Sequence, residues 1–243
     1  MAALNRMTAR SVVLSVLLGA HPAWATAAEL VRLTADFDIK EPTLRVALTR
    51  MVHAGDLVRS ANGYRLSDRL LARQRRQDDA INPQLRAWDG SWITLIITSV
   101  GIDARVRAGL RNHLQQSRFA ELREGVWLRP DNVELTLPKD VLRRIRVMRG
   151  YDDNPGELVE LLWDLPQWAR TGRSLLDEIS TATDIPGRFV AAAGIVRHLL
   201  TDPVLPDELL PDHWPGSALR HAYAGFAAEL VARRNESELM EAR

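Results

Sequence analysis

Cysteine is absent from the 243 residues of this sequence, which excludes disulfide bonds, cysteine nucleophiles and thiolate metal sites. No apolar run approaches the ~18 residues that a membrane-spanning helix requires. The sequence also lacks a glycine-rich phosphate loop, a nucleophile elbow and a His-x-x-x-His pair. It therefore predicts no catalytic residues, no metal site and no bound cofactor, which favours a binding protein over an enzyme.

Hydrophobic residues make up 46% of the chain and charged residues 26%, as in an ordinary globular protein of one large domain or two to three smaller ones. The net charge is only +1, but it is unevenly distributed. Residues 1–76 hold twelve Lys and Arg against six Asp and Glu, a net of +6, and the remainder holds twenty against twenty-five, a net of −5. A basic N-terminal segment on an acidic remainder is expected when only one end of a chain meets phosphate.

Residues 43–52 have the pattern of an amphipathic helix. Leu44, Ala47, Leu48 and Met51 recur at intervals of three and four and therefore lie on one face. The other side of this helix presents Val46, Thr49, Arg50 and His53, with Arg45 at the margin. One face of the helix is thus suited to a core and the other to a polar partner.

A hairpin is predicted directly after this helix, within residues 57–66. Asn62-Gly63 is the preferred pair for a type I′ turn and fixes the tip, while Arg59 and Arg65 flank it. A helix of this kind followed by an arginine-bearing hairpin is typical of a winged helix-turn-helix that reads DNA. The alternative interpretation is a solvated helix face, with its arginines in salt bridges within the domain, beside a plain exposed hairpin.

Three further helices surround these elements. One runs over residues 8–18, capped by Thr8 and ended by Gly19, a second runs over 26–36, and a third follows the hairpin over 68–77, capped by Ser67. Pro42 is accepted in the first turn of the helix over 43–54, and Gly55 ends that helix in the left-handed conformation. Arg69, Arg73, Arg75 and Arg76 of the third helix are interpreted as a solvated face.

The N-terminal helix has an alternative interpretation. Arg6 and Arg10 precede an apolar stretch over 11–20, and Ala25-Thr26-Ala27 is similar to a signal-peptidase site. On this interpretation the chain is a secreted or envelope binding protein. Cleavage there would remove the helix on which residues 28–66 must pack. The downstream pattern therefore favours a core helix and a cytoplasmic protein.

A different pattern begins after Asn82-Pro83 and Asp89-Gly90, which mark a linker. Residues 92–98 are almost continuously apolar, as in a strand buried on both faces. The other predicted elements are a helix over 103–116, strands over 119–122 and 125–130, and one more strand over either 133–137 or 144–148. This order predicts a ferredoxin-like unit. Its Trp88, Trp92 and Trp127 are interpreted either as core or as part of a dimerisation face.

From about residue 155 the pattern is helical to the end. The predicted helices cover 157–171, 173–180, 185–200 and 217–240. The fold class is therefore α+β. The sequence predicts a winged helix-turn-helix domain over 1–80, a central ferredoxin-like α+β domain over 88–150 and a helical C-terminal domain over 155–243.

Several stretches along the chain carry a resemblance to a known family. They are Thr8-Ala9-Arg10-Ser11, Val46-Ala47-Leu48-Thr49-Arg50-Met51-Val52 with Gly55-Asp56-Leu57, Trp88-Asp89-Gly90-Ser91-Trp92, Trp163-Asp164-Leu165, and residues 202–211 with Trp214-Pro215-Gly216. In this order, over nearly its whole length, the chain resembles the PaaX family of bacterial transcriptional repressors. The resemblance implies a homodimeric repressor of an aromatic catabolic operon, as in phenylacetate catabolism, that is released by an aryl-CoA such as phenylacetyl-CoA.

The residues expected to bind DNA lie on the exposed face of the helix and on the hairpin. Thr43, Thr49 and Arg50 are predicted to reach base edges, Val46 a thymine methyl group, Arg45 and His53 backbone phosphates, and Arg59, Asn62 and Arg65 the DNA beside the wing. The expected partner is a double-stranded operator that is an inverted repeat, since a two-fold dimer reads two half-sites.

An acyl-CoA effector would need arginines near its phosphates and apolar groups around its acyl chain. Trp163, Trp168, Arg170, Arg173, Arg188 and Arg197 are candidates by composition only. The central domain also resembles a CRISPR-associated nuclease fold, which makes a metal-dependent nuclease an alternative. Such nucleases place a metal-binding aspartate at the end of the first strand, whereas this strand ends at 97–100. Asp103 is better explained as a helix cap.

Overall fold

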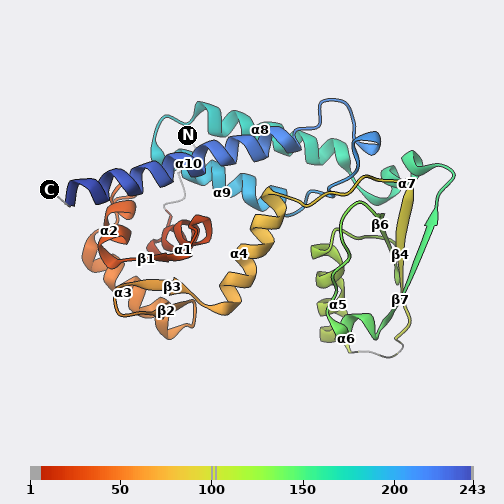
Figure 1. Ribbon diagram of the computed structural model, residues 1–243, viewed down its shortest axis with the longest axis horizontal. Helices are drawn as coiled ribbons and strands as arrows, with labels where there is room; N and C mark the ends of the chain where they lie inside the picture. Colours follow the sequence, from red (N-terminus) through yellow and green to blue (C-terminus); the bar gives the residue numbers. More distant parts are fainter. Residues whose placement is uncertain (1–6, 100, 102, 242–243) are drawn as a thin grey trace. The chain divides into compact units, whose positions relative to one another are not determined.

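The computed structural model describes residues 7–99, 101 and 103–241, with side chains up to residue 233. They form two compact units, most of whose elements are labelled in Figure 1. The head unit comprises residues 1–78, 175–196 and 221–243, and the sheet unit comprises 79–174 and 197–220. The helical C-terminal segment contributes residues to both units. Val100, at the end of the predicted central strand, lies outside the described residues, as do Ile102 and Arg6.

The head unit begins with the elements of a winged helix-turn-helix. They are α1 (Ala9–Gly19), β1 (Trp24–Ala25), α2 (Ala27–Ala35), α3 (Glu41–His53), β2 (Leu57–Arg59), β3 (Tyr64–Leu66) and most of α4 (Asp68–Ile81). The strands form an antiparallel sheet in the order β1-β3-β2. The second half of α8 (Leu165–Thr181) and most of α9 (Ile185–Leu199) and α10 (Gly216–Glu241) complete the unit.

Local sequence explains where the first helices begin. The Thr8 hydroxyl accepts a hydrogen bond from the Ser11 amide at 3.2 Å and caps α1, as predicted. Thr26 and Glu29 form a reciprocal capping box at the start of α2. At the other end of α1, the buried Gln74 amide donates to the carbonyl oxygens of the last turn, the shortest bond being 2.9 Å to that of Ala20. α4 thereby satisfies backbone groups that a helix end leaves without partners.

The core of the head unit is built around α1. Six of its eleven residues are buried, among them Val13 and Leu17, and they pack with Leu44 and Leu48 of α3. The prediction of a core helix at this position is confirmed. Aromatic residues of α9 and α10 join the same core, where Phe189 lies edge-on to Phe226 with ring centroids 6.0 Å apart.

The prediction that Ser67 caps α4 is wrong. The Ser67 hydroxyl is buried and has no hydrogen-bond partner among the described residues, so the helix begins without a side-chain cap from this residue. The Ser67 carbonyl instead accepts from the amides of Leu70 and Leu71. One face of α4, including Leu70 and Gln74, is buried, as expected for a helix that is basic on its other sides.

The sheet unit has the ferredoxin-like order of strand, helix, two strands, helix and strand. Its elements are β4 (Ser91–Ile97), α5 (Ala104–Gln116), β5 (Ala120–Arg123), β6 (Val126–Pro130), α6 (Lys139–Leu142) and β7 (Ile145–Tyr151), followed by α7 (Pro155–Leu162) and the short helix η1 (Asp207–Leu209). The sheet is antiparallel, in the order β5-β6-β4-β7. Of the two alternatives for the last strand, the one over 144–148 is confirmed.

Both faces of the central strand β4 are covered. Ile93 and Leu95 pack with Leu110 and Leu114 of α5 on one face. Trp92 packs on the other face with residues of β6, α7 and the segment after α9. Trp92 and Trp127 are 2% and 1% exposed, so the core interpretation of these two tryptophans is confirmed and the dimer-face alternative is wrong for them.

The first C-terminal helices break at a different place from the prediction. The chain is extended at Trp163, and Asp164 accepts a hydrogen bond from the Gln167 amide at 2.9 Å at the start of α8. The predicted break at Gly172 is wrong, because that glycine lies inside α8. A Cβ at Gly172 would lie 3.1 Å from side-chain atoms of both Pro215 and Leu219, so the glycine permits close packing.

Residues 199–202 are held by polar side chains within the sheet unit. Arg118 donates to the carbonyl oxygens of Leu199, Leu200 and Asp202 at 3.2, 2.8 and 2.9 Å. The buried Asp202 carboxylate accepts from Arg220 at 2.6 Å. These bonds fix the end of α9 and the chain that follows it. Burial lowers the pKa of the Arg118 guanidinium, and the Asp202 charge acts in the opposite direction.

The described residues offer neither a membrane-spanning helix nor a cluster of metal ligands. In the part of the chain that the structure describes, no helix has both the length and the apolar composition to span a membrane. The same residues contain no group of three or more His, Cys, Asp or Glu placed to hold a metal ion. Asp103 is the cap of α5, and its carboxylate accepts from the Val106 amide at 2.9 Å, as predicted.

Candidate nucleic-acid interface

The outer face of α3 is exposed, and its inner face anchors the helix. Leu44, Leu48 and Met51 are at most 1% exposed and belong to the head core. The predicted DNA-contacting residues of the helix are all exposed: Thr43, Arg45, Val46, Thr49, Arg50 and His53. Val46 stands out among them, since an apolar side chain that is 51% exposed in the middle of a polar face is suited to an apolar contact.

The side chains of this face differ in whether they already have hydrogen-bond or ion-pair partners. The Arg45 guanidinium is held by Glu41 one turn earlier, with contacts of 2.8 and 2.6 Å, which is the salt-bridge alternative. The Thr49 hydroxyl donates to the Arg45 carbonyl at 3.0 Å and keeps its acceptor capacity. Within the described residues, the side chains of Arg50 and His53 make no hydrogen bond or ion pair. Arg50 is therefore the arginine of α3 that is best placed to meet an external acceptor.

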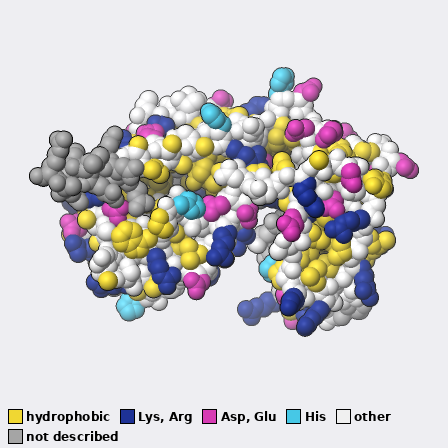
Figure 2. Space-filling model, in the orientation of Figure 1, with side chains coloured by type: hydrophobic (Ala, Val, Ile, Leu, Met, Phe, Trp, Pro, Cys, Tyr) yellow, Lys and Arg dark blue, Asp and Glu magenta, His cyan; other side chains and the backbone are white. Residues whose placement is uncertain are grey.

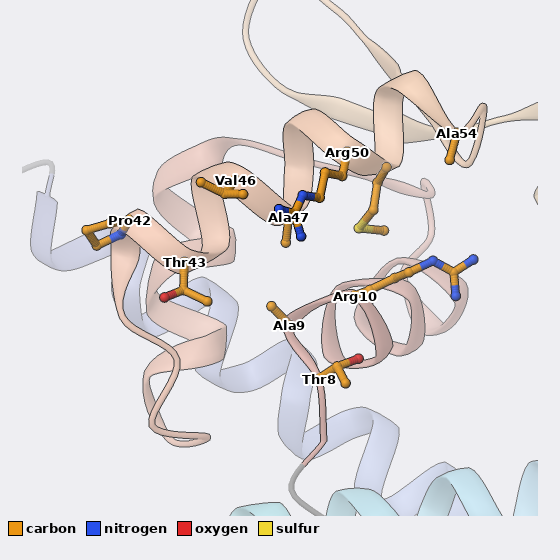
Figure 3. Close-up of a pocket in the computed structure, with 10 residues that line it drawn as sticks. Thr8, Ala9, Arg10, Pro42, Thr43, Val46, Ala47, Arg50 and Ala54 are labelled. Carbon is orange, nitrogen blue, oxygen red and sulfur yellow. The ribbon is translucent and has the colours of Figure 1, made fainter.

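A hollow of about 630 Å³ lies between α3 and the start of α1 (Figure 3). Its lining includes Thr43, Val46 and Arg50 from α3, and Thr8 and Arg10 from the first turn of α1. Figure 3 shows the α1 side chains on the opposite side of the hollow from those of α3. Thr8 and Arg10 were not among the predicted contacts, because only the packing of the two helices brings them to this face.

The position of Arg10 is fixed by a buried carboxylate. Asp56, whose side chain is 3% exposed, accepts from Arg10 at 2.7 Å and from Arg69 at 2.6 Å. The cluster ties the first turn of α1 and the start of α4 to the residue that follows α3. Arg69 is thus not simply part of a solvated face, whereas Arg73, Arg75 and Arg76 are exposed as predicted.

The wing is a three-stranded sheet with a longer tip than predicted. Arg59 pairs with Tyr64, so four residues, 60–63, connect the strands. Gly63 lacks the positive φ that a type I′ turn requires, and the prediction of that turn is wrong. Arg59 and Asn62 are exposed and have no side-chain partner among the described residues. Arg65 is also exposed and lies 3.9 Å from Asp68.

The cause of the altered turn is the unpredicted strand β1. Ala25 of β1 pairs with Tyr64 of β3, directly beside the tip. A Cβ on Gly63 would overlap the Ala25 carbonyl oxygen and lie 3.1 Å from the Thr26 Cα, both backbone atoms. Glycine is therefore required here by the close approach of a neighbouring strand and not by the turn.

We expect Gly63→Ala to lower the free energy of unfolding by about 2 kcal/mol, because backbone atoms cannot move aside as a flexible side chain can. Gly55→Ala is the control: Gly55 has a φ of +69° with no atom within 4 Å of an added Cβ, and only the left-handed backbone opposes the change, at about 1 kcal/mol. Denaturant unfolding followed by circular dichroism measures both. An equal or smaller loss for Gly63→Ala would contradict the close approach of β1.

The candidate effector residues lie in different surroundings. Trp168 is buried and stacks between His198 and Trp214, with ring centroids 4.1 and 4.4 Å away. Trp163 is partly buried and packs against the core cluster that contains Trp92. Burial lowers the pKa of His198, while its contact with the Trp168 carbonyl opposes that shift. The tryptophans are therefore engaged in packing within the sheet unit.

The four candidate arginines are divided between the units. Arg170, Arg173 and Arg197 are exposed in the sheet unit, and Arg170 donates to Gln167 at 2.7 Å. Arg188 belongs to the head unit and pairs with Glu229 at 2.7 Å. Of the six candidates, the structure directly joins none to another through a hydrogen bond or ring contact among the described residues.

Comparison with known proteins gives matches along the whole chain. Family models match at residues 8–70 (PaaX-like protein), 85–148 (PaaX protein central Cas2-like domain) and 166–237 (PaaX-like protein C-terminal domain). The chain is 28% identical over 212 residues to the transcriptional repressor PaaX of Escherichia coli (strain K12), a match that covers 74% of this chain and 66% of that protein. The chain thus spans just under two thirds of the length of this curated relative.

Among solved structures, the chain is similar to the uncharacterized protein Rv0674 from Mycobacterium tuberculosis. The two are 64% identical and superpose with a TM-score of 0.85, over 95% of this chain and 99% of the other. An α+β architecture with head, ferredoxin-like and helical segments in this order is therefore shared with a solved relative.

Proposed function

The chain belongs to the PaaX family, and on that premise we propose that it is a cytoplasmic DNA-binding regulator that represses transcription and is not an enzyme. The observation that carries the proposal is the outer face of α3. It holds exposed groups that can read base edges, and its strongest donor, Arg50, is not occupied by any described residue. The similarity to a protein named a transcriptional repressor supports the same assignment.

The elements of the head have separate roles in this proposal. Thr43, Thr49 and Arg50 read base edges in the major groove, and Val46 contacts a thymine methyl group. His53 and the wing residues Arg59, Asn62 and Arg65 contact the backbone or the minor groove and set the register. Arg45 contacts a backbone phosphate by moving away from its charge partner Glu41. Thr8 and Arg10 extend the surface across the hollow toward the same DNA.

We further infer a homodimer and an effector. A two-fold dimer places two α3 helices on an inverted repeat, with half-sites about one helical turn apart or a multiple of it. An aryl-CoA such as phenylacetyl-CoA releases the operator of a catabolic operon by favouring a conformer with misplaced heads. The exposed Arg170, Arg173 and Arg197, with Trp163 and Trp168, are the candidate contacts in the sheet unit, and Arg188 in the head unit is a weaker one because Glu229 already pairs with it.

The proposal is tested with the full chain and DNA from the region upstream of its own gene. We expect footprinting to show two protected half-sites in an inverted repeat, and phenylacetyl-CoA to abolish the protection while free coenzyme A does not. Protection that persists with every CoA thioester tested would remove the effector class and leave the DNA-binding function. Absence of any preferred site would contradict the regulator itself.

A further inference from the structure

The central segment of the chain is basic, in contrast to the rest of the sequence after residue 76. Residues 88–150 carry eleven Lys and Arg against seven Asp and Glu, a net of +4. Residues 151–243 carry eight against sixteen, a net of −8. The negative charge of the chain beyond residue 76 therefore comes from its C-terminal part, and the ferredoxin-like part has a positive surface of its own.

Some arginines of the sheet unit have structural partners. Arg111 pairs with Glu121 at 2.7 Å, and Arg86 and Arg149 share Asp131 at 2.6 and 2.7 Å. Two more, Arg118 and Arg129, donate to backbone carbonyl oxygens, and burial lowers the pKa of Arg129 to about 10. These arginines are accounted for by the fold.

The other cations gather at one end of the sheet. Ile97, the last residue of β4, pairs with Ile145, the first of β7, and its amide donates to the Gly125 carbonyl in the turn between β5 and β6. α5 begins and α6 ends at this same edge of the unit, so seven cations meet there. We call Arg105, Arg107, Arg123, Lys139, Arg143, Arg144 and Arg146 the cationic end. Figure 2 shows Lys and Arg side chains collected where Figure 1 draws α6 and the adjacent ends of the strands.

The side chains of the cationic end lie at the surface of the sheet unit. All are exposed except Arg144, which is half-buried. Arg105, Arg123, Lys139, Arg143 and Arg146 make no hydrogen bond or ion pair within the part of the chain that the structure describes. Three acidic residues share this end, namely Asp103, Glu124 and Asp140, and Asp103 is occupied in capping α5. Like charges gathered on one surface repel one another, and a bound polyanion relieves that repulsion.

We propose that the cationic end is a second DNA contact, which binds backbone phosphates without reading sequence. The proposal rests on the regulator function, because duplex DNA is the polyanion that a DNA-binding regulator meets. Exposed guanidinium groups pair well with phosphate oxygens through their fork of donors. Among the described residues at this end there is no exposed aromatic platform for unstacked bases, so a duplex fits the end better than a single strand. Its contribution is affinity and salt dependence rather than operator choice.

The test compares two charge-matched double variants of the full chain. Arg143→Gln with Arg146→Gln removes two cations from the cationic end. Arg111→Gln with Arg149→Gln removes two exposed arginines of the same unit that already have carboxylate partners. Binding to a labelled duplex of arbitrary sequence is titrated at several salt concentrations, and each phosphate contact contributes about 0.9 to the slope of log affinity against log salt.

For the variant at the cationic end we expect a slope shallower by about 2 and an affinity at 0.1 M salt that is lower by about tenfold or more. The control is expected to keep the wild-type slope. An unchanged slope in the first variant, or an equal change in both, overturns the proposal. Intact folding is checked by tryptophan fluorescence, and Arg105→Gln with Lys139→Gln replaces the first pair if that pair unfolds.

A third variant separates this proposal from the function of the head. Arg50→Ala, tested on operator DNA and on the arbitrary duplex, is expected to lose preference for the operator with little change in the salt slope. If Arg50→Ala behaves so while the cationic-end variant binds as wild type, only the second contact is wrong. If the wild-type chain binds no duplex at all, both the regulator function and the second contact are wrong.

Discussion

Arg118→Leu is expected to lower the free energy of unfolding of the sheet unit by about 3 kcal/mol, the largest loss in stability predicted for this chain. The guanidinium donates to three carbonyl oxygens at the end of α9 and just beyond it. Leucine fills much of the same space but donates nothing, so these carbonyl groups would lose their donor where water cannot easily replace it. Six of the seven tryptophans belong to this unit, and their fluorescence in a denaturant titration reports the change.

The matched control for Arg118 is Arg111→Leu, nearby in sequence. Arg111 is exposed and pairs with Glu121, and a surface ion pair contributes about 0.5 kcal/mol or less. If Arg118→Leu cost no more than Arg111→Leu, the carbonyl contacts would not be holding the segment after α9.

Arg50→Ala is expected to weaken operator binding by about 1–3 kcal/mol while leaving stability unchanged, because its side chain is exposed and makes no contact that the fold needs. The loss is expected at one base position of each half-site. An operator altered at that position should bind the wild-type protein less well than the original operator does. The Arg50→Ala variant should bind both operators equally. A gel-shift titration at fixed salt with wild-type and altered operators measures it.

Arg45→Ala is the internal control for this effect, on the same face of the same helix. Its guanidinium is shared with Glu41, and we expect a smaller loss of affinity with no change in base preference. A larger loss for Arg45 than for Arg50 would reverse the two roles. Equal affinity of the Arg50 variant and the wild type would remove Arg50 from the reading residues.

The elements that depend on local sequence could be predicted well. The spacing of Leu44, Leu48 and Met51 correctly indicated which side of α3 is buried, because a surface helix on a core leaves a period in its apolar residues. Thr8 caps α1 as predicted, and Gly55 adopts its left-handed conformation, with a φ of +69°. These outcomes depend on a few residues that are close in the chain.

The errors come from contacts between distant segments. The local sequence predicts that Gly63 is a turn residue, but β1, almost forty residues earlier in the chain, sets its environment. The local sequence predicts a helix break at Gly172, but close packing against Pro215 and Leu219 is what requires glycine there. Neither contact leaves a local periodicity or a spacing that sequence alone could reveal. In both cases a glycine is needed for close approach and not for its dihedral freedom.

The candidate site could likewise be predicted where it depends on local sequence, but not where it depends on packing between distant segments. Its exposed face on α3 follows from the helical period, and the structure leaves all six predicted residues of that face accessible. The hollow that Thr8 and Arg10 share with α3 could not be predicted, because it arises where two helices pack. The Asp56 cluster that positions Arg10 likewise joins residues forty-six positions apart.

The central claim, that α3 lies in the major groove of an operator, has a direct test in this cysteine-free chain. Ala54→Cys, at the exposed end of α3, and Leu161→Cys, exposed on α7, each provide a single thiol for a tethered iron–EDTA group. We predict DNA cleavage from position 54 in two clusters, one in each half-site and about one helical turn apart or a multiple of it, and none in these clusters from position 161. Cleavage of the half-sites from position 161, with none from position 54 in a protein that still binds, would contradict the account.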